Sequence, residues 1–322
     1  MSHYRYAPVI ITTLNRVEHL QRCIRSLQNC KYAEKTELYI SVDYPPDERY
    51  NEGYKLVCDY LHNGISGFLK TNIFWQEKNL GPNNNFSFLR EAVFQKYDYF
   101  IATEDDNEFS YNFLEYMNRA LERFELCEDV LNICAIQEKG PWNSREVSAI
   151  YQKICPVYGL GCWKKKELQL EKIDKSYFEK IASDSPKMKK LKTYSNTCFQ
   201  QFVEGILTGR NGIFWSDKDN TKWSDITRSI YAICEGKYFV APTDSKARNW
   251  GFDGSGENMK KKFFSPEEKW VLDKKKDYCL KIAHDEQMIY KDTRYIDRKC
   301  LKTPKIYVIK AEIKYWIWRM KH

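Results

Sequence analysis

The first 135 residues alternate short apolar runs with helical periodicities, and this alternation limits the possible folds more than any other feature. Runs rich in β-branched and aromatic residues, typical of buried strands, occur at 9–13, 38–43, 72–76 and 99–103. Helical patterns follow them at 17–27, 51–61, 86–93 and 113–124. Strands that alternate with helices favour a mostly parallel sheet with right-handed crossovers. The sequence therefore predicts an α/β fold, a mostly parallel sheet flanked by helices.

The second half is less regular. Strand-like segments occur at 150–158 and 238–241, and helical patterns at 199–207 and 229–234. Two local caps are expected in the first half, Asn15 with Glu18 in a capping-box spacing and Ser110 before the helix at 113. The tail mixes Ile and Trp with Lys and Arg, so we expect a C-terminal helix that either packs on the body or lies at a membrane surface.

Composition excludes several classes of protein. The 322 residues carry a net charge of +8 and are 43% apolar, with no apolar stretch near the roughly 20 residues of a spanning helix. Eleven cysteines without a CxxC pair, and no signal-peptide core, favour reduced thiols and a cytoplasmic location. The histidines lack zinc spacing. Clusters of lysine indicate either a solvated surface or attraction to an anionic partner.

The most informative motif is the acidic triplet Glu104-Asp105-Asp106, directly after the fourth predicted strand. Ligands of parallel sheets gather at the carboxyl ends of strands. Three adjacent carboxylates repel one another, and a divalent cation with oxygen ligands would balance them. Because side chains alternate along a strand, only one or two of the three can face the same ion. The alternative is a solvated acidic turn that caps the next helix.

Other polar residues follow the remaining strands of the first half. Asp43 can accept hydrogen bonds from a nucleobase or a ribose, and Lys78 with Asn79 can meet a phosphate or a sugar. Each also has a plainer interpretation as a turn or cap residue. No glycine occurs at 13–16 and no GxSxG is present, which argues against a dinucleotide fold, a P-loop and a serine hydrolase.

Several segments together resemble the GT-A fold glycosyltransferases. Residues 8–16 resemble the opening strand of that superfamily, 41–43 its nucleotide-contacting strand, 77–81 the loop under the donor, and 104–106 its metal motif. The Glu-Asp-Asp form is similar to that of the N-acetylglucosaminyltransferase I group and of bacterial surface-polysaccharide sugar transferases. Tyr158 to Lys164 and Asn249 to Gly256 are similar to later segments of the bacterial group.

The resemblance implies a domain organisation and a set of site residues. A GT-A domain would span 1–260, with a nucleotide-binding half at 1–136 and an acceptor half at 137–260, followed by a basic and aromatic extension at 261–322. Asp106 would bind Mn²⁺ or Mg²⁺. The implied donor-binding residues are Thr12, Leu14, Asn15, Arg16, Asp43, Lys78, Asn79, Glu104 and Asp105.

The resemblance also places a catalytic acid near a tryptophan. Trp223-Ser224-Asp225 is the best match, with Asp219 as a second candidate. Asp225 would act as general base on the acceptor hydroxyl in a single displacement with inversion; its alternative role is a helix N-cap. Trp163 and Trp223 are expected to contact the acceptor, and core packing is the alternative for both. Glu257-Asn258 stands where many relatives carry a histidine, which leaves open an inactive scaffold.

The expected function is transfer of a sugar from a nucleotide-sugar donor, a UDP-sugar, to a glycan or lipid-linked acceptor. The implied setting is capsule, O-antigen or lipooligosaccharide synthesis on the inner face of a bacterial membrane, with peripheral contact to anionic lipid and no nucleic-acid partner. Two alternatives remain, a sugar-phosphate nucleotidyltransferase and a non-enzymatic nucleic-acid-binding protein. The first would favour a Gly-rich phosphate loop and the second a nucleic-acid-binding motif, and the sequence contains neither.

Overall fold

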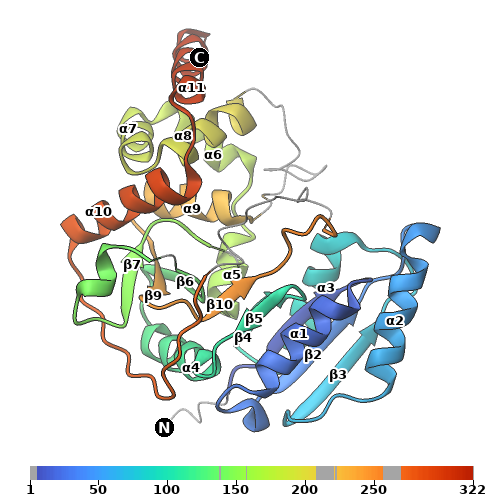
Figure 1. Cartoon of the computed structure of the whole chain (residues 1–322). Coiled ribbons are helices and arrows are strands. Elements are labelled where there is room, and N and C mark those ends of the chain that lie inside the picture. The colour runs from blue at the N-terminus through green and yellow to red at the C-terminus, as the bar shows by residue number, and fades with distance from the viewer. Residues whose placement is uncertain are drawn as a thin grey trace.

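The chain forms one large sheet with helices on both faces (Figure 1). The computed structural model describes residues 6–137, 139–156, 158–207, 221, 223–256 and 270–321. Eight strands pair in the order β3-β2-β1-β4-β8-β6-β9-β7. Their bounds are β1 Val9–Thr13, β2 Glu37–Val42, β3 Lys70–Trp75, β4 Tyr99–Glu104, β6 Val130–Cys134, β7 Ala149–Gln152, β8 Leu160–Trp163 and β9 Tyr238–Pro242. Two further strands, β5 Asn107–Phe109 and β10 Ala247–Asn249, form an antiparallel ribbon beside it.

The sheet is mostly parallel, as the alternating pattern predicts. β3, β2, β1 and β4 pair in parallel, and β6 pairs in parallel with β9. Only β8 and β7 run against their neighbours. The carboxyl ends of β1, β2 and β4 therefore meet at one edge, where the polar residues of the sequence motifs follow.

Four helices of the first half cover the two faces of this sheet. They are α1 Val17–Gln28, α2 Asn51–His62, α3 Gly81–Phe94 and α4 Phe113–Phe124. One apolar cluster joins α1, α2 and α4 to one face, and a second joins α3 to the other. Alternate residues of β1 divide between the clusters, Val9 and Ile11 in the first and Ile10 in the second, as a strand buried on both faces requires.

Both predicted caps are wrong. The N-cap of α1 is Arg16, without a side-chain cap bond, and Asn15 instead lies in the loop that follows β1. The N-cap of α4 is Asn112, and Ser110 donates its hydroxyl to the Asn112 side chain at 2.9 Å. Ser110 also donates its backbone N–H to the Lys246 carbonyl at 2.9 Å, a tertiary contact that local spacing does not encode.

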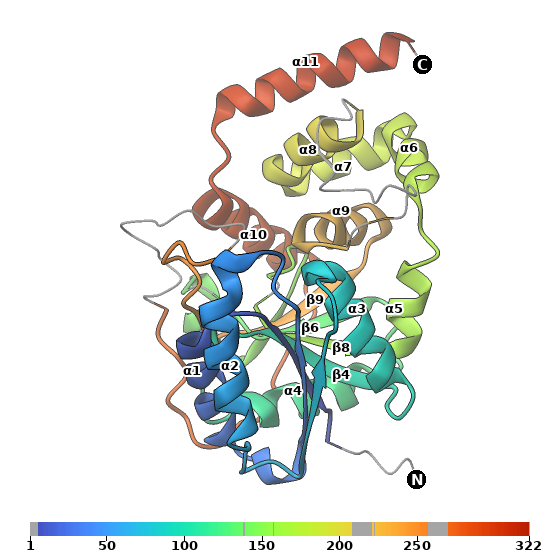
Figure 2. The same cartoon turned by 90° about the vertical axis from the view of Figure 1, so that its right-hand side faces the viewer.

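A layer of helices lies beyond one end of the sheet (Figure 2). Its helices are α6 Lys175–Ser183, α7 Ser185–Tyr194, α8 Asn196–Phe202, α9 Asp225–Glu235, α10 Glu286–Ile296 and α11 Lys305–Lys321. The short helix α5 Lys164–Leu170 instead lies beside the sheet, directly after β8 (Figure 2). A π-helical turn at Val203–Leu207 extends α8, and another at Asp297–Leu301 extends α10. The predicted strand at 150–158 ends at Gln152, and the helix predicted at 229–234 begins at Asp225. This layer has its own apolar core, which includes Phe178, Phe202 and Ile230.

Candidate functional site

A cavity of about 200 Å³ opens at the carboxyl ends of β1, β2 and β4. It is lined by residues of the loops after these strands, by the start of α3 and by the segment after β10. The lining residues are Thr12, Thr13, Leu14, Asn15, Arg16, Asp43, Tyr50, Asn79, Gly81, Pro82, Asn85, Glu104, Asp105, Asp106, Gly251, Ser255 and Gly256. The structure thus brings together all predicted donor and metal residues except Lys78, which is exposed and lies outside this lining.

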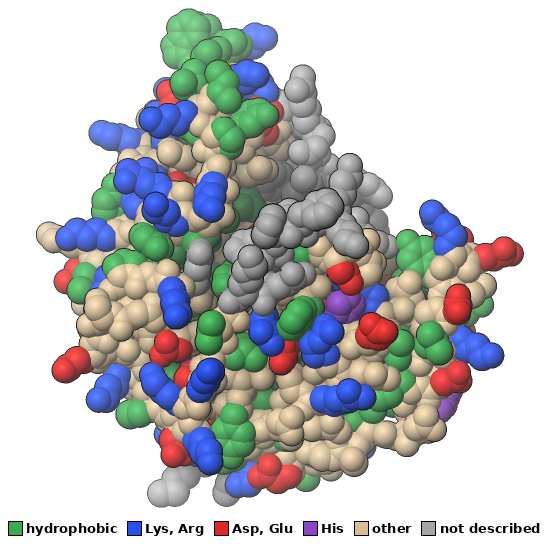
Figure 3. All heavy atoms as spheres, viewed as in Figure 1, with side chains coloured by type: hydrophobic (Ala, Val, Ile, Leu, Met, Phe, Trp, Pro, Cys, Tyr) green, Lys and Arg blue, Asp and Glu red, His purple; other side chains and the backbone are tan. Residues whose placement is uncertain are grey.

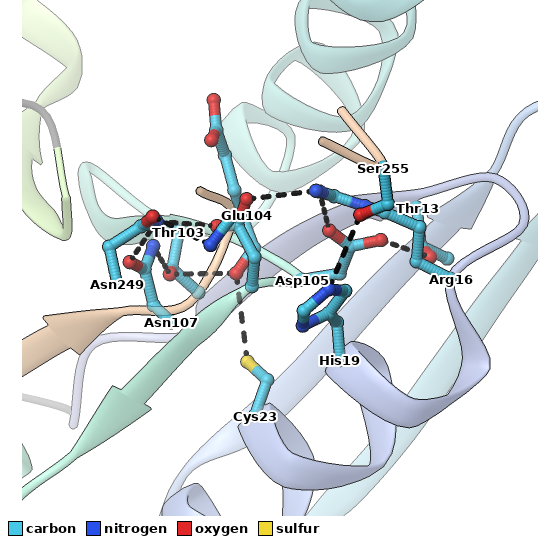
Figure 4. A network of polar contacts seen from close by, with 12 residues as sticks. Thr13, Arg16, His19, Cys23, Thr103, Glu104, Asp105, Asn107, Asn249 and Ser255 are labelled. Atoms are coloured by element: carbon cyan, nitrogen blue, oxygen red, sulfur yellow. Dashed lines mark hydrogen bonds and ion pairs between the residues drawn. The ribbon is translucent and has the colours of Figure 1, made fainter. Parts of the chain in front are cut away.

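At the floor of the cavity, one guanidinium lies between two carboxylates (Figure 4). Arg16 Nη1 is 3.0 Å from Asp106 Oδ2, and Arg16 Nη2 contacts Asp105 Oδ1. Thr13 Oγ1 donates to the other oxygen of Asp105 at 2.7 Å. Asp105 is 2% exposed and Asp106 6%. One cation therefore faces two buried carboxylates, and the cluster keeps an excess of negative charge.

The antiparallel ribbon fixes the position of Asp106. Asn249, which pairs with Asn107 across the ribbon, donates its side-chain amide to Asp106 Oδ1 at 2.7 Å. The Trp250 backbone N–H donates to the Asp106 carbonyl at 2.9 Å. A Cβ on Gly251 would lie 2.2 Å from Asp106 Oδ2, so a side chain there would displace the carboxylate. The sequence singled out 249–256 by resemblance alone, and the structure places its start directly against the acidic triplet.

The charges of the triplet change the pKa values around them. Loss of hydration in the cleft, together with the charges of Asp106 and Asp105, raises the pKa of Glu104 to about 7. Burial alone would lower the pKa of Arg16, but the carboxylates of Asp105 and Asp106 raise it, so the guanidinium stays charged. Figure 4 shows the Glu104 carboxylate pointing away from Arg16. Glu104 is thus the one acid of the triplet that Arg16 does not hold.

The donor set fits a cation that keeps part of its hydration. Among the described residues, no three His, Cys, Asp or Glu side chains converge on one point as a complete metal cage. Mg²⁺ and similar ions need only one or two protein carboxylates when substrate phosphates and waters complete the shell. Asp106 and Asp105 supply two such groups, and both are now bonded to Arg16. A divalent cation would therefore have to replace Arg16 at one or both carboxylates.

Asp43 forms hydrogen bonds with the loops that follow β2 and β3. Its Oδ1 accepts the backbone N–H of Leu80 at 2.8 Å and that of Tyr44 at 2.9 Å. Asn79 donates to the Tyr44 carbonyl at 2.7 Å and lies 3.5 Å from Asp43 Oδ2. Asp43 is only 5% exposed, so it shapes the cavity wall as well as presenting one oxygen toward it.

Asp225 is the first residue of α9 and is half-buried. Ser224 is the N-cap of this helix, in a capping box with Thr227, so the alternative that Asp225 is the cap is wrong. Burial raises the pKa of Asp225, and the Asp225 charge contributes to the raised pKa of Glu104. Asp225 is not among the residues that line the cavity, so its role as a base stays a prediction. Asp219, Glu257 and Asn258 lie outside the described residues.

The two predicted acceptor tryptophans lie in different surroundings. Trp163 is 3% exposed, donates its indole N–H to the Leu121 carbonyl at 3.2 Å, and has Lys166 Nζ 3.6 Å from its ring centre. An acceptor role for Trp163 does not fit this structure, because no face of its ring is open. Trp223 is half-buried, and it donates to the Leu170 carbonyl at 3.1 Å and packs against Phe178. Its acceptor role stays a prediction.

Some residues of the lining were not assigned from the sequence. Asn85 is 1% exposed on the buried face of α3, and its side-chain oxygen accepts the Ser41 hydroxyl at 2.5 Å. Its position in the same helical stripe as Leu89 and Val93 was an available signal, because a polar residue in an apolar stripe needs a polar partner. Tyr50, just before α2, has no comparable signal.

The solved structures to which the chain is similar share little sequence with it. No protein-family model matches the chain, and no curated protein matches it. Among solved structures, it is similar to TarS of S. aureus (TM-score 0.30, 16% identity over 44% of this chain and 24% of that one). It is also similar to the mannosyltransferase PcManGT of Pyrobaculum calidifontis in complex with GDP-Man and Mn²⁺ (TM-score 0.35, 14% identity over 52% of this chain and 47% of that one). The chain thus spans less than half the length of either protein.

Proposed function

We propose that the chain is a GT-A-type glycosyltransferase that moves a sugar from a UDP-sugar to a hydroxyl of a glycan or lipid-linked acceptor. The observation that carries this proposal is the buried Asp105–Asp106 pair, which faces a cavity at the carboxyl ends of parallel strands. Such an edge is where α/β sheets bind nucleotides. The excess negative charge of the pair suits a ligand that brings its own cation.

The residues of the cavity divide between the parts of the donor. The wall formed by Asp43 and Asn79 would accept the nucleobase and ribose, and Thr12 with the loop after β1 would close over them. Asp106, with Asp105, would hold Mn²⁺ or Mg²⁺, which when bound would neutralise the departing diphosphate. Arg16, once it leaves the carboxylates, is a permanent cation within reach of the same cavity and would contact a phosphate oxygen.

Asp225 is the proposed general base. It would take the proton of the acceptor hydroxyl while that oxygen attacks the anomeric carbon and the bond to the diphosphate breaks with its electron pair. One displacement of this kind inverts the configuration at the anomeric carbon. The raised pKa of Asp225 favours the role, because a base is most effective when its pKa approaches the working pH.

The setting is also a proposal. Synthesis of capsule, O-antigen or lipooligosaccharide on the inner face of a bacterial membrane would supply nucleotide sugars and lipid-linked acceptors. No helix among the described residues is long and apolar enough to cross a membrane.

A product assay tests the proposed reaction against nucleotidyl transfer. The chain would be incubated with Mn²⁺ and a panel of UDP-sugars with acceptors, and separately with nucleoside triphosphates and sugar phosphates. We expect release of UDP in the first series. Pyrophosphate release in the second series, without UDP release in the first, would contradict the proposal.

Substitution of the base tests the mechanism. We expect Asp225→Asn to lower kcat by about 10²–10⁴-fold, because the amide cannot take the acceptor proton. Mn²⁺-dependent UDP binding should be unchanged. Asp285→Asn, at the exposed N-cap of α10, is the matched control and should keep native turnover. An Asp225→Asn enzyme with native kcat would remove Asp225 from the reaction.

A further inference from the structure

The last helix of the chain has two apolar faces on opposite sides. Val308 and Ala311 are buried against the helical layer, and Tyr315 and Trp318 pack on the same core. Tyr315 also donates its hydroxyl to the Ala182 carbonyl at 3.0 Å, at the C-terminal end of α6. This inner face accounts for the attachment of α11 to the body.

The outer face of α11 is apolar and uncovered in this structure. Six side chains on it are between 40% and 62% exposed: Ile306, Ile309, Ile313, Trp316, Ile317 and Met320. At 3.6 residues per turn they fall within an arc of about 100°, opposite the buried face. Figures 1 and 2 place α11 at the end of the molecule farthest from the main sheet, beyond α7 and α8.

Positive charge borders this outer face. The helix carries five cations, Lys305, Lys310, Lys314, Arg319 and Lys321, and one acid, Glu312. Glu312 is paired with Lys192 of α7 at 2.7 Å and Lys314 with Glu204 at 2.5 Å, so the positive charge at this face comes from the other four cations. In the helical projection, Lys305 and Arg319 flank one side of the apolar arc, and Lys310 and Lys321 the other. Figure 3 shows hydrophobic side chains gathered at this end of the molecule, with Lys and Arg beside them.

We propose that the outer face of α11 inserts into the interface of an anionic lipid bilayer, with the flanking cations on the lipid headgroups. An apolar stripe with a tryptophan, bordered by Lys and Arg on both sides, is the pattern of helices that lie in a membrane surface. The positive charge beside the outer face favours a lipid surface over a second copy of the chain as its partner. A second copy of α11 would bring a second set of like charges to the contact, whereas anionic headgroups neutralise them.

This proposal goes beyond sugar transfer and stands on a surface outside the candidate site. It would nevertheless hold the chain at a surface that carries lipid-linked molecules. Binding should depend on anionic lipid and should weaken as salt screens the cations.

Vesicle flotation of the full chain tests the proposal. The native protein should float with vesicles of phosphatidylcholine and phosphatidylglycerol, and much less with phosphatidylcholine alone. We expect the outer-face variant Ile313→Ser/Trp316→Ser/Ile317→Ser to bind at least tenfold more weakly. The charge variant Lys305→Gln/Lys310→Gln/Lys321→Gln should lose most of its dependence on salt and phosphatidylglycerol.

The matched control replaces three exposed apolar side chains elsewhere. Leu56→Ser/Leu69→Ser/Leu126→Ser changes three leucines that are 49%, 62% and 91% exposed and far from α11 in the sequence, and it should float like the native chain. Equal flotation of the outer-face and control variants, or no flotation of the native chain, would overturn the proposal. A third result would also overturn it: light scattering shows that the native chain is a dimer and the outer-face variant a monomer, and neither protein binds vesicles.

The same samples separate this proposal from the proposed function. Mn²⁺-dependent UDP binding should be native in the outer-face variant, because its substitutions lie outside the cavity. Loss of flotation with retained UDP binding supports the lipid contact whatever the reaction is. Absence of UDP binding in the native chain, with flotation intact, would count against the donor site alone.

Discussion

Two of the arginines in this molecule face buried carboxylates in different surroundings. Arg16 lies between Asp105 and Asp106 on the wall of a cavity. Arg228, on α9, makes a bidentate pair with Glu167 of α5 at 2.7 and 2.9 Å. The second pair is enclosed, because the side chains of Arg228 and Glu167 are only 7% and 4% exposed.

The difference lies in charge balance and in access. Arg228 and Glu167 neutralise each other, and Arg228 also donates to the Asn132 side chain at 2.9 Å, so the group is satisfied within the protein. Arg16 is one cation for two carboxylates, with Glu104 as a third acid beside them. A balanced, enclosed pair fixes the packing of α9 and α5. An unbalanced cluster beside a cavity is suited to exchange its cation for a ligand.

The largest effect is expected at the enclosed pair. Arg228→Met leaves Glu167 charged and buried without its partner, which typically costs about 3–5 kcal/mol. Urea denaturation should show this loss in the free energy of unfolding. The double variant Arg228→Met/Glu167→Met should recover most of it. A single variant as stable as the native chain would show that the pair does not hold the two helices.

The next prediction compares how variants of the two arginines respond to Mn²⁺. Arg16→Met should lower the melting temperature in a chelator, because two buried carboxylates lose the guanidinium that pairs with them. Mn²⁺ at about 100 times its Kd should return about 2.7 kcal/mol to this variant, since the ion replaces the guanidinium.

Arg228→Met serves as the comparison, and Mn²⁺ should raise its melting temperature no more than that of the native chain. If Mn²⁺ raised the melting temperature of neither variant, or of both equally, the claim that Mn²⁺ can replace Arg16 but not Arg228 would be wrong.

The smallest of the three effects concerns the support of Asp106. Asn249→Ala removes the amide that holds Asp106 Oδ1, and partners of metal ligands typically change metal affinity by about 10–100-fold. Titration of Mn²⁺ in the presence of UDP, followed by electron paramagnetic resonance, measures the change. Asn249→Asp should bind Mn²⁺ at least as weakly as Asn249→Ala, because it places a second negative charge beside Asp106. Native Mn²⁺ affinity in both variants would exclude a positioning role for Asn249.

The strands of the first half were predicted closely, and the helical layer only in part. Helices were expected near 199–207, near 229–234 and at the C-terminal tail, whereas α6, α7 and α10 were not expected. β1, β2, β3 and β4 begin and end within two residues of their predicted ranges, because strands in the middle of an α/β sheet are continuous apolar runs in the sequence. The strand predicted at 150–158 was too long, because an apolar run by itself does not show that its strand ends at Gln152. The helical layer is joined to α5 by the pair Arg228–Glu167, whose residues are 61 positions apart, and no local pattern reveals this contact.

Some features of the candidate site could also be predicted from the sequence, and others could not. Residues at strand ends, such as Asp43 and Asp106, could be placed at one edge from topology alone. The bond between Arg16 and the triplet could not, because the residues are 89 and 90 positions apart and their contact depends on side-chain conformation. The core position of Trp163 was equally hidden, since a tryptophan at a strand end can face either the core or a ligand.

The central claim is that Asp106 holds a divalent cation that accompanies a nucleotide diphosphate. Calorimetric titration of Mn²⁺ into the chain with UDP tests it most directly, with native protein, Asp106→Ala, and Asp277→Ala as control, since Asp277 has an 88% exposed side chain. We predict Mn²⁺-dependent UDP binding in the native and control proteins and none in Asp106→Ala, with unchanged far-ultraviolet circular dichroism in all three. Native binding in Asp106→Ala would contradict the claim.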